Sequence, residues 1–187
     1  MTKSKTTNKM PSNAPKTPSV ALNPELRAKI PANGGIGFCR SKGIVAKIIR
    51  LGEWIRFRKG EINHAFIVHP SGRVYQAEAR GVTNTRMIED VAPGGDISIY
   101  PFPDGVDVEK VFVFCKFNVG KRYGWGSILA IALDVILPLW TPAFRRPNTW
   151  ICSALAAEAL RAGGWVRQDL WPDIYVVTPT QLRNALD

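Results

Sequence analysis

The pattern of apolar and polar positions predicts a chain that mixes short strands with helices. Several short apolar runs have the length and the β-branched or aromatic content of strands. The two runs at 62–69 and 73–79 are separated by a Pro-Ser-Gly turn and predict a β-hairpin. The predicted strands are residues 34–39, 62–69, 73–79, 97–102 and 111–117.

Other segments have the spacing and end signals of helices. Ser41 is placed to cap a helix over 42–51, and Thr178 with Pro179 is placed to begin a short C-terminal helix. Helical character is also expected over most of 123–137, and from Cys152, capped by Thr149 or Asn148, to Gly163–Gly164. The predicted fold class is α+β, with an antiparallel β-sheet of about five to six strands packed against helices.

Charge divides the chain into a tail and a domain. The net charge is +10, and half of this excess lies in residues 1–30, a polar, Pro-containing segment unable to bury enough apolar surface to fold alone. We predict a basic, low-complexity tail over 1–30 and one domain over 31–187. The tail is interpreted either as a solvated segment or as an arm that docks on a partner such as a protein assembly, on nucleic acid or on an anionic surface.

The cysteine and hydropathy patterns argue against disulfide-rich, metal-binding and membrane-spanning classes of protein. Cys39, Cys115 and Cys152 form neither a disulfide framework nor a metal-ligand spacing, so no cofactor or metal is expected. The longest apolar run, 128–139, is too short for a membrane span, and no secretory signal is visible, so cytoplasmic synthesis is expected. The chain contains no recognisable nucleic-acid-binding module.

Cys152 is the most informative residue. It opens a predicted helix, where the helix dipole favours the thiolate, which is the nucleophilic form. His64, in the apolar strand 62–69, is the preferred base, and His69, near the turn, is the rival. The histidine thus precedes the cysteine, the reverse of the order in papain, but geometry rather than chain order defines such sites.

The hairpin turn predicts what lies opposite His64. A three-residue loop closed by Gly72 sets His69 opposite Arg73, so that partner numbers sum to 142. His64 then faces Glu78, a carboxylate whose burial in an apolar strand pair is costly without a partner. Glu78 would orient the imidazole toward Cys152, with Gln76 or Asn63 as alternative orienting groups.

Each of these residues also has an ordinary structural interpretation. A buried cysteine is most often an inert apolar residue, and a single strand histidine is usually structural. Cys39 and Cys115, which begin no predicted helix, are interpreted as core residues. The combination of Cys152, His64 and Glu78 is what points to nucleophilic catalysis.

Several motifs resemble a known family. The run His64–Val68, the Gly72 turn, the strand Val74–Val82 and the Trp150-Ile151-Cys152-Ser153 motif resemble the circularly permuted papain-fold enzymes of the NlpC superfamily, which include YiiX-like proteins. Lys121–Trp125 resembles the Tyr-containing segment of that family, and Thr178–Leu182 resembles its usual ending. The resemblance covers roughly residues 34–186.

The resemblance implies a permuted papain-like fold with Cys152 as nucleophile, His64 as base and Glu78 as orienting group. Tyr123 and Trp125 are predicted substrate contacts on an aromatic rim of the site. The chain departs from the usual pattern at Ala65-Phe66, where the family often has an apolar residue followed by glycine. Phe66 shares the predicted catalytic face and is expected to narrow the cleft and limit substrate size.

The residues and the resemblance together predict a cysteine amidase or peptidase that acts on peptidoglycan peptides. Trp54, Arg56 and Arg58 are expected to add to an aromatic, basic rim that suits an anionic peptide stem. Two other functions remain open at this point. One is a structural or assembly component of a phage virion with little or no activity, and the other is a lipid acyl hydrolase or acyltransferase.

Overall fold

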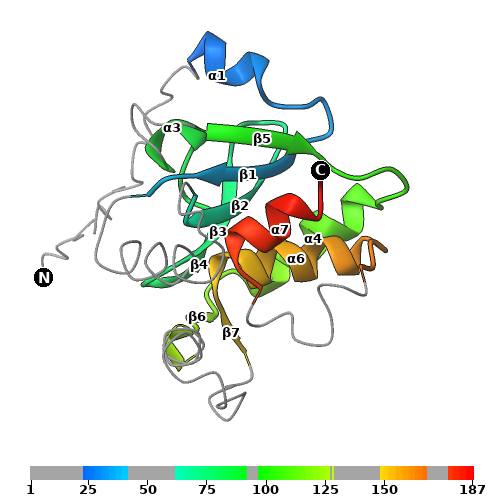
Figure 1. The fold of residues 1–187 in the computed structure, drawn as a ribbon. Helices are drawn as coiled ribbons and strands as arrows, with labels where there is room; N and C mark the ends of the chain where they lie inside the picture. The colour runs from blue at the N-terminus through cyan, green and yellow to red at the C-terminus, as the bar shows by residue number, and fades with distance from the viewer. Residues whose placement is uncertain (1–22, 42–61, 92–96, 127, 129–147, 168–176) are drawn as a thin grey trace, which may run out of the picture.

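The computed structural model describes residues 23–41, 62–91, 97–126, 128, 148–167 and 177–187. The predicted α+β class is confirmed, because a five-stranded antiparallel sheet packs against helices (Figure 1). The strand order is β4-β3-β2-β1-β5. The strands are β1 (Gly35–Cys39), β2 (His64–Val68), β3 (Val74–Glu78), β4 (Gly81–Thr83) and β5 (Ile97–Pro101).

The predicted hairpin is confirmed, and so is its register for the two pairs nearest the turn. Ile67 pairs with Tyr75 and Val68 with Val74, so partner numbers sum to 142 as the turn chemistry predicts. Gly72 has a φ of +83° and donates its N–H to the His69 carbonyl at 2.8 Å. A left-handed residue at this position is what closes a three-residue loop, and glycine adopts that conformation without steric cost.

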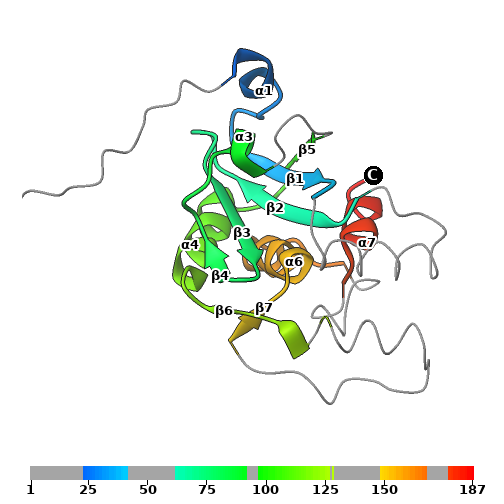
Figure 2. The same ribbon diagram turned by 90° about the vertical axis from the view of Figure 1, so that its left-hand side faces the viewer.

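Helices cover both faces of the sheet. On one face, α4 (Val108–Asn118), α6 (Cys152–Ala162) and α7 (Pro179–Asn184) bury a large apolar cluster against β1, β2 and β3. On the other face, α3 (Ile88–Val91) and the segment around α1 (Pro24–Ala28) cover a smaller cluster (Figure 2). Side chains alternate between the two clusters along β2, where Ala65 and Ile67 face one and Phe66 and Val68 the other, as the twofold period of a strand requires.

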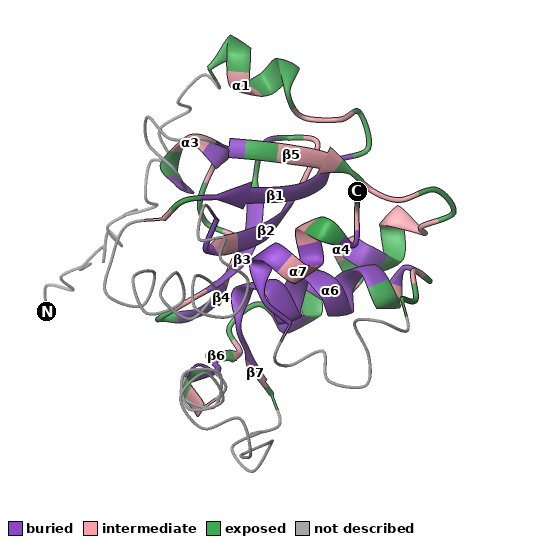
Figure 3. Ribbon diagram, in the orientation of Figure 1, coloured by how far each residue is buried: buried purple, intermediate pink, exposed green. Residues whose placement is uncertain are grey.

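Helix α6 is the central helix of the fold. Its residues Cys152 to Leu160 are all buried, as the continuous burial colour along most of the helix shows (Figure 3). The Ser153 hydroxyl donates to the Val177 carbonyl at 2.5 Å and ties the start of α6 to the segment before α7. Helix α7 begins as predicted, with Pro179 in its first turn and a capping box between Thr178 and Gln181.

The prediction of a strand over 111–117 is wrong, because this segment lies within helix α4. The run alternates β-branched and aromatic residues and so imitates a strand. The structure instead buries Val111, Cys115 and Asn118, which are spaced along one helical face. Asp107 caps the helix by accepting the Lys110 N–H at 3.1 Å.

The start of α6 also differs from the expectation. Its N-cap residue is Ile151, which makes no side-chain cap bond, so neither Thr149 nor Asn148 caps the helix. Thr149 belongs to β7 (Thr149–Trp150), which pairs in parallel with β6 (Arg122–Tyr123). The pairing sets Tyr123 opposite Trp150. It thereby brings the segment Lys121–Trp125, which resembles the Tyr-containing segment of the family, close to Cys152.

Contacts with the sheet begin before residue 31. Leu26 and Ile30 pack on the cluster beneath α1 and α3, and the Asn23 N–H donates to Glu89 at 2.9 Å. The predicted helix over 42–51 and most of the one over 123–137 lie outside the described residues. Within the described residues, no helix has the length and apolar character needed to cross a bilayer.

Gly37 is expected to be essential to the strand that supports His64. A Cβ atom at this position would lie 2.0 Å from the Phe66 ring, which is 1% exposed and belongs to an apolar cluster of the core. Gly37→Ala should therefore destabilise the protein by about 2–3 kcal/mol in chemical denaturation. The control Gly120→Ala, with open space around its Cβ but a φ of +86°, should cost about 1 kcal/mol.

A double variant tests the cause of this effect. Phe66→Leu shortens the side chain that faces Gly37, so it should recover part of the stability lost in Gly37→Ala. Equal losses with and without the Phe66 substitution would contradict steric overlap as the cause.

Candidate active site

The candidate site lies where the β2–β3 pairing ends. His64 is the first residue of β2 and Cys152 is the first residue of α6. The β2–β3 ladder covers Ile67 with Tyr75 and Val68 with Val74, and β3 pairs over 76–78 with β4 on its other edge. The backbone at His64 is therefore held by β1, through pairing with Cys39, and its side facing β3 is open to other groups.

The Cys152 sulfur and the His64 imidazole form a hydrogen-bonded pair. Burial alone would raise the pKa of the Cys152 thiol, but the hydrogen bond and charge of His64 bring this pKa below its ordinary value. Burial alone would lower the pKa of His64, but the bond to Cys152 and its negative charge raise it. Both pKa shifts favour the thiolate and the imidazolium over the thiol and the neutral imidazole.

Two backbone N–H groups also stabilise the thiolate. Those of Ala65 and Ser153 donate to the Cys152 sulfur and contribute to its lowered pKa. The Ser153 N–H belongs to the first turn of α6, where the helix leaves such groups without carbonyl partners. The Ala65 N–H lies beyond the paired part of the β2–β3 ladder. The site therefore lies where that ladder ends.

Gln76 orients the imidazole. Its Oε1 atom lies 2.8 Å from Nε2 of His64, and its Nε2 atom donates to Glu78 Oε1 at 2.5 Å. A carboxylate only accepts hydrogen bonds, so the Gln76 amide group must point its NH2 at Glu78 and its oxygen at His64. His64 Nε2 therefore carries a hydrogen, and Nδ1 is the nitrogen that faces the sulfur.

Glu78 is not the direct partner of His64 that the turn register predicts. The two residues share a face of the sheet, but the β2–β3 ladder ends at Ile67 and Tyr75, and the His64 ring reaches the diagonal neighbour Gln76. Gln76 was one of the alternative orienting groups. Glu78 acts behind it, with Arg86 Nε 3.4 Å from its carboxylate, and its charge contributes to the raised pKa of His64.

The other predicted alternatives lie elsewhere. The Asn63 amide oxygen accepts hydrogen bonds from the backbone N–H and hydroxyl of Ser41, at 2.8 and 2.9 Å, and so fastens the end of β1. His69 lies at the opposite end of β2, where its Nδ1 is 2.8 Å from the Ser71 hydroxyl. His69 is therefore a turn residue rather than a base for Cys152.

Neither of the remaining cysteines resembles Cys152 electrostatically. Cys39 and Cys115 are fully buried in the two apolar clusters. Burial, with a smaller contribution from the charge of Cys152, raises the pKa of Cys39 to about 12. Burial alone raises the pKa of Cys115. Of the three thiols, only that of Cys152 has a lowered pKa.

The predicted substrate contacts differ in their exposure. Tyr123 is buried, and its pKa is raised by burial and by the charge of Cys152, so its phenol keeps its proton. Trp125 is 50% exposed and its ring meets the Tyr123 ring edge-on at 5.2 Å. Phe66 lies 5.8 Å from the His64 ring but is packed within the core, so it offers no surface to a substrate.

Two contributions to the environment of the Cys152 sulfur are not predictable from the sequence. The thiolate-binding N–H of Ala65 has no side-chain signature, and the approach of Tyr123 to Cys152 depends on the β6–β7 pairing. Trp54, Arg56 and Arg58 lie outside the described residues. Among the residues that are described, no group of three or more His, Cys, Asp and Glu side chains is arranged to hold a metal ion.

Comparison with known proteins gives no match to a family model and no match to a curated protein.

A substitution of Glu78 tests whether the hydrogen bonds from Glu78 through Gln76 to His64 orient the imidazole. Glu78→Gln is expected to lower kcat/KM about tenfold, because a neutral amide no longer fixes which end of Gln76 faces His64. The loss of negative charge should also lower the pKa of His64, so the alkaline limb of the rate profile moves to lower pH. The exposed Asp104→Asn serves as a matched control that should change neither quantity. An unshifted alkaline limb in Glu78→Gln would rule out this role.

Proposed function

We propose that this chain is a cysteine-dependent amidase or peptidase with a permuted papain-like fold. The observation that carries the proposal is the pairing of the Cys152 sulfur with His64, whose other ring nitrogen binds an amide held by a carboxylate. A nucleophile, a base and an orienting group in hydrogen-bonded sequence are the requirements for thiol catalysis. The order of a histidine strand before a cysteine helix agrees with the permuted arrangement.

The chemistry follows from the protonation states. The Cys152 thiolate attacks the carbonyl carbon of an amide, forming a C–S bond and an oxyanion. As the oxyanion collapses, the C–N bond breaks and the imidazolium of His64 gives its proton to the leaving nitrogen. His64 then takes a proton from water, the resulting hydroxide cleaves the thioester, and the acid product leaves while the thiolate is restored.

Two groups near the sulfur suit the oxyanion. The backbone N–H of Cys152 lies in the first turn of α6, where it has no carbonyl partner within the helix. The Tyr123 phenol remains protonated beside Cys152 and is the second donor in this proposal. The developing negative charge would meet a hydrogen-bond donor that needs no rearrangement.

Peptidoglycan peptides are the proposed substrate class. The motif resemblance supports it, and the exposed Trp125 with the neighbouring Arg122 provides an aromatic and cationic surface near Tyr123. Such a surface suits a peptide stem that carries carboxylates.

The test compares the wild-type chain with Cys152→Ala on purified peptidoglycan and, separately, on acyl-lipid esters. The proposal expects release of peptide fragments by the wild-type protein and none by Cys152→Ala. Peptide release by Cys152→Ala would overturn the thiol mechanism. Hydrolysis of the lipid esters alone would replace peptidoglycan by lipid, and a protein inert on both that remains with virus particles would support a structural role.

A further inference from the structure

One face of helix α4 leaves apolar side chains in water. Val113 is 57% exposed and Phe117 is 77% exposed, and residues four apart lie on the same side of a helix. Val119, just beyond the helix end, is 39% exposed. These three residues, together with Lys116, Lys121 and Arg122, are called the α4 face below.

The α4 face is also predominantly basic. The segment 110–125 contains no acidic residue and carries Lys116, Lys121 and Arg122 around the apolar side chains. The exposed Glu109 lies one helical turn before Val113, at the end of α4 far from Lys121. The Lys121 Nζ atom lies 4.7 Å from the centre of the Phe117 ring, so cation and aromatic ring occupy the same spot on the surface. Apolar and cationic groups are therefore interleaved rather than separated.

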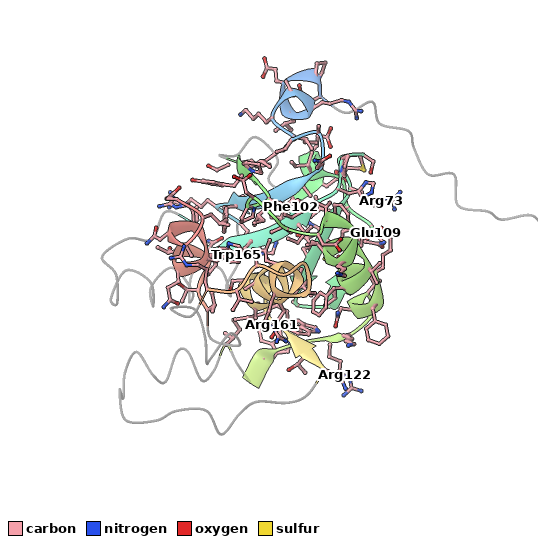
Figure 4. All side chains as sticks on the ribbon, turned by 90° about the vertical axis from the view of Figure 1, so that its right-hand side faces the viewer. Arg73, Phe102, Glu109, Arg122, Arg161 and Trp165 are labelled. Atoms are coloured by element: carbon pink, nitrogen blue, oxygen red, sulfur yellow. The ribbon has the colours of Figure 1, made fainter. Side chains whose placement is uncertain are left out.

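The positive charge extends from α4 to the hairpin turn. After burial, the charges of Lys116 and Arg73 are the causes that lower the pKa of His69. His69 packs against α4 through Phe112, with ring centres 4.9 Å apart. In Figure 4 the labelled Arg73 and Arg122 lie on the same side of the molecule as α4, as does the labelled Glu109 of that helix.

The combination of apolar and cationic side chains on the α4 face favours one kind of partner over others. A second copy of the chain would place basic face against basic face, which repels. A nucleic acid would use the cations but would leave Phe117 and Val113 without an apolar partner. An anionic bilayer uses both, because its headgroups bind lysine and arginine while aromatic side chains enter the boundary with the acyl chains.

We propose that the α4 face docks the protein on the surface of an anionic lipid bilayer. Phe117 enters the headgroup region, and Lys116, Lys121 and Arg122 bind lipid phosphates around it. Docking of this kind is peripheral and needs no spanning helix. It is independent of whether Cys152 is catalytic.

The test measures co-sedimentation of the full-length protein with vesicles of phosphatidylcholine alone and of phosphatidylcholine mixed with phosphatidylglycerol. Binding is expected only to the mixed vesicles and should fall as salt is added. Phe117→Ser should weaken binding at least about tenfold, since the apolar anchor is lost. Lys121→Glu should weaken it at least about fivefold, since one cation is replaced by an anion.

Matched controls separate the face from the rest of the chain. Val166→Ser replaces an apolar side chain that is 64% exposed elsewhere, and Lys29→Glu reverses an exposed charge away from α4. Both should bind more tightly than the corresponding α4 variants. Circular dichroism monitors folding, and Val113→Ser provides a second anchor variant if Phe117→Ser unfolds.

Three results would overturn the proposal. One is equal binding of the wild type and both anchor variants, which would assign binding to the basic residues 1–30. Another is equal binding to neutral and anionic vesicles. The third is no vesicle binding together with a dimer, or a DNA complex, that Phe117→Ser disrupts.

Discussion

Replacing Cys152 with serine is expected to lower the rate of amide hydrolysis by at least about a thousandfold while leaving the fold intact. The substitution keeps the size of the side chain at a position that is 3% exposed, so packing changes little. A hydroxyl has a far higher pKa than a thiol, and His64 with two backbone N–H groups does not ionise it at neutral pH. The measurement is kcat/KM on the substrate released by the wild-type protein.

Thermal unfolding supplies the control for this variant. Cys152→Ser should unfold within a few degrees of the wild type, and Cys115→Ser, which replaces a buried thiol away from the site, should retain activity where it folds. Full activity in Cys152→Ser would mean that the sulfur is only a core group.

Replacing His64 with alanine is expected to lower kcat/KM by about a thousandfold for a different reason. The variant retains the thiol but loses the hydrogen bond and charge that lower the pKa of Cys152, leaving burial to raise it. The thiolate population at neutral pH then falls, and the leaving nitrogen also lacks its proton donor. His69→Ala is the matched control, because it removes the other histidine at the far end of the same strand.

The pH dependence of the wild-type rate follows from the same pair. Activity should fall on the acid side as pH drops through the lowered pKa of Cys152, and on the alkaline side as pH rises through the raised pKa of His64. With ordinary values, about 8.5 for cysteine and 6.5 for histidine, the ion pair would hardly form at any pH. His69→Ala should keep this profile, and a rate profile unchanged in His64→Ala would contradict the assignment of its limbs.

Local chemistry explains what the sequence predicted well. Gly72 closes a turn that only a left-handed residue can make, and this fixes the register of the two β2–β3 pairs nearest the turn. The capping box at Thr178 is equally local, because its two hydrogen bonds join residues three apart. Each feature depends on a few neighbouring residues and not on the rest of the fold.

Features that depend on tertiary contacts were predicted less well. The run 111–117 has the composition of a strand, and its helix depends on the Asp107 cap and on packing of Val111 and Cys115 under α6. The choice of Gln76 rather than Glu78 as the partner of His64 depends on the point at which the β2–β3 ladder ends. The residues near the turn do not determine where the pairing of β2 with β3 ends.

The candidate site was predictable where single residues carry a chemical signal. Cys152 before an alanine-rich helix and His64 in an apolar strand are visible in the sequence. The Ala65 N–H, which also supports the thiolate, is a backbone group and carries no signal of its own. Convergence of segments so far apart in the chain required the folded structure.

The most direct test of the central claim is the pH dependence of iodoacetamide alkylation at each cysteine, followed by mass spectrometry in the wild type and in His64→Ala. The account predicts that Cys152 reacts at mildly acid pH, ahead of Cys39 and Cys115, and that His64→Ala moves its reaction to alkaline pH. Reaction of Cys152 only at alkaline pH, with the same profile in both proteins, would contradict the thiolate–imidazolium pair.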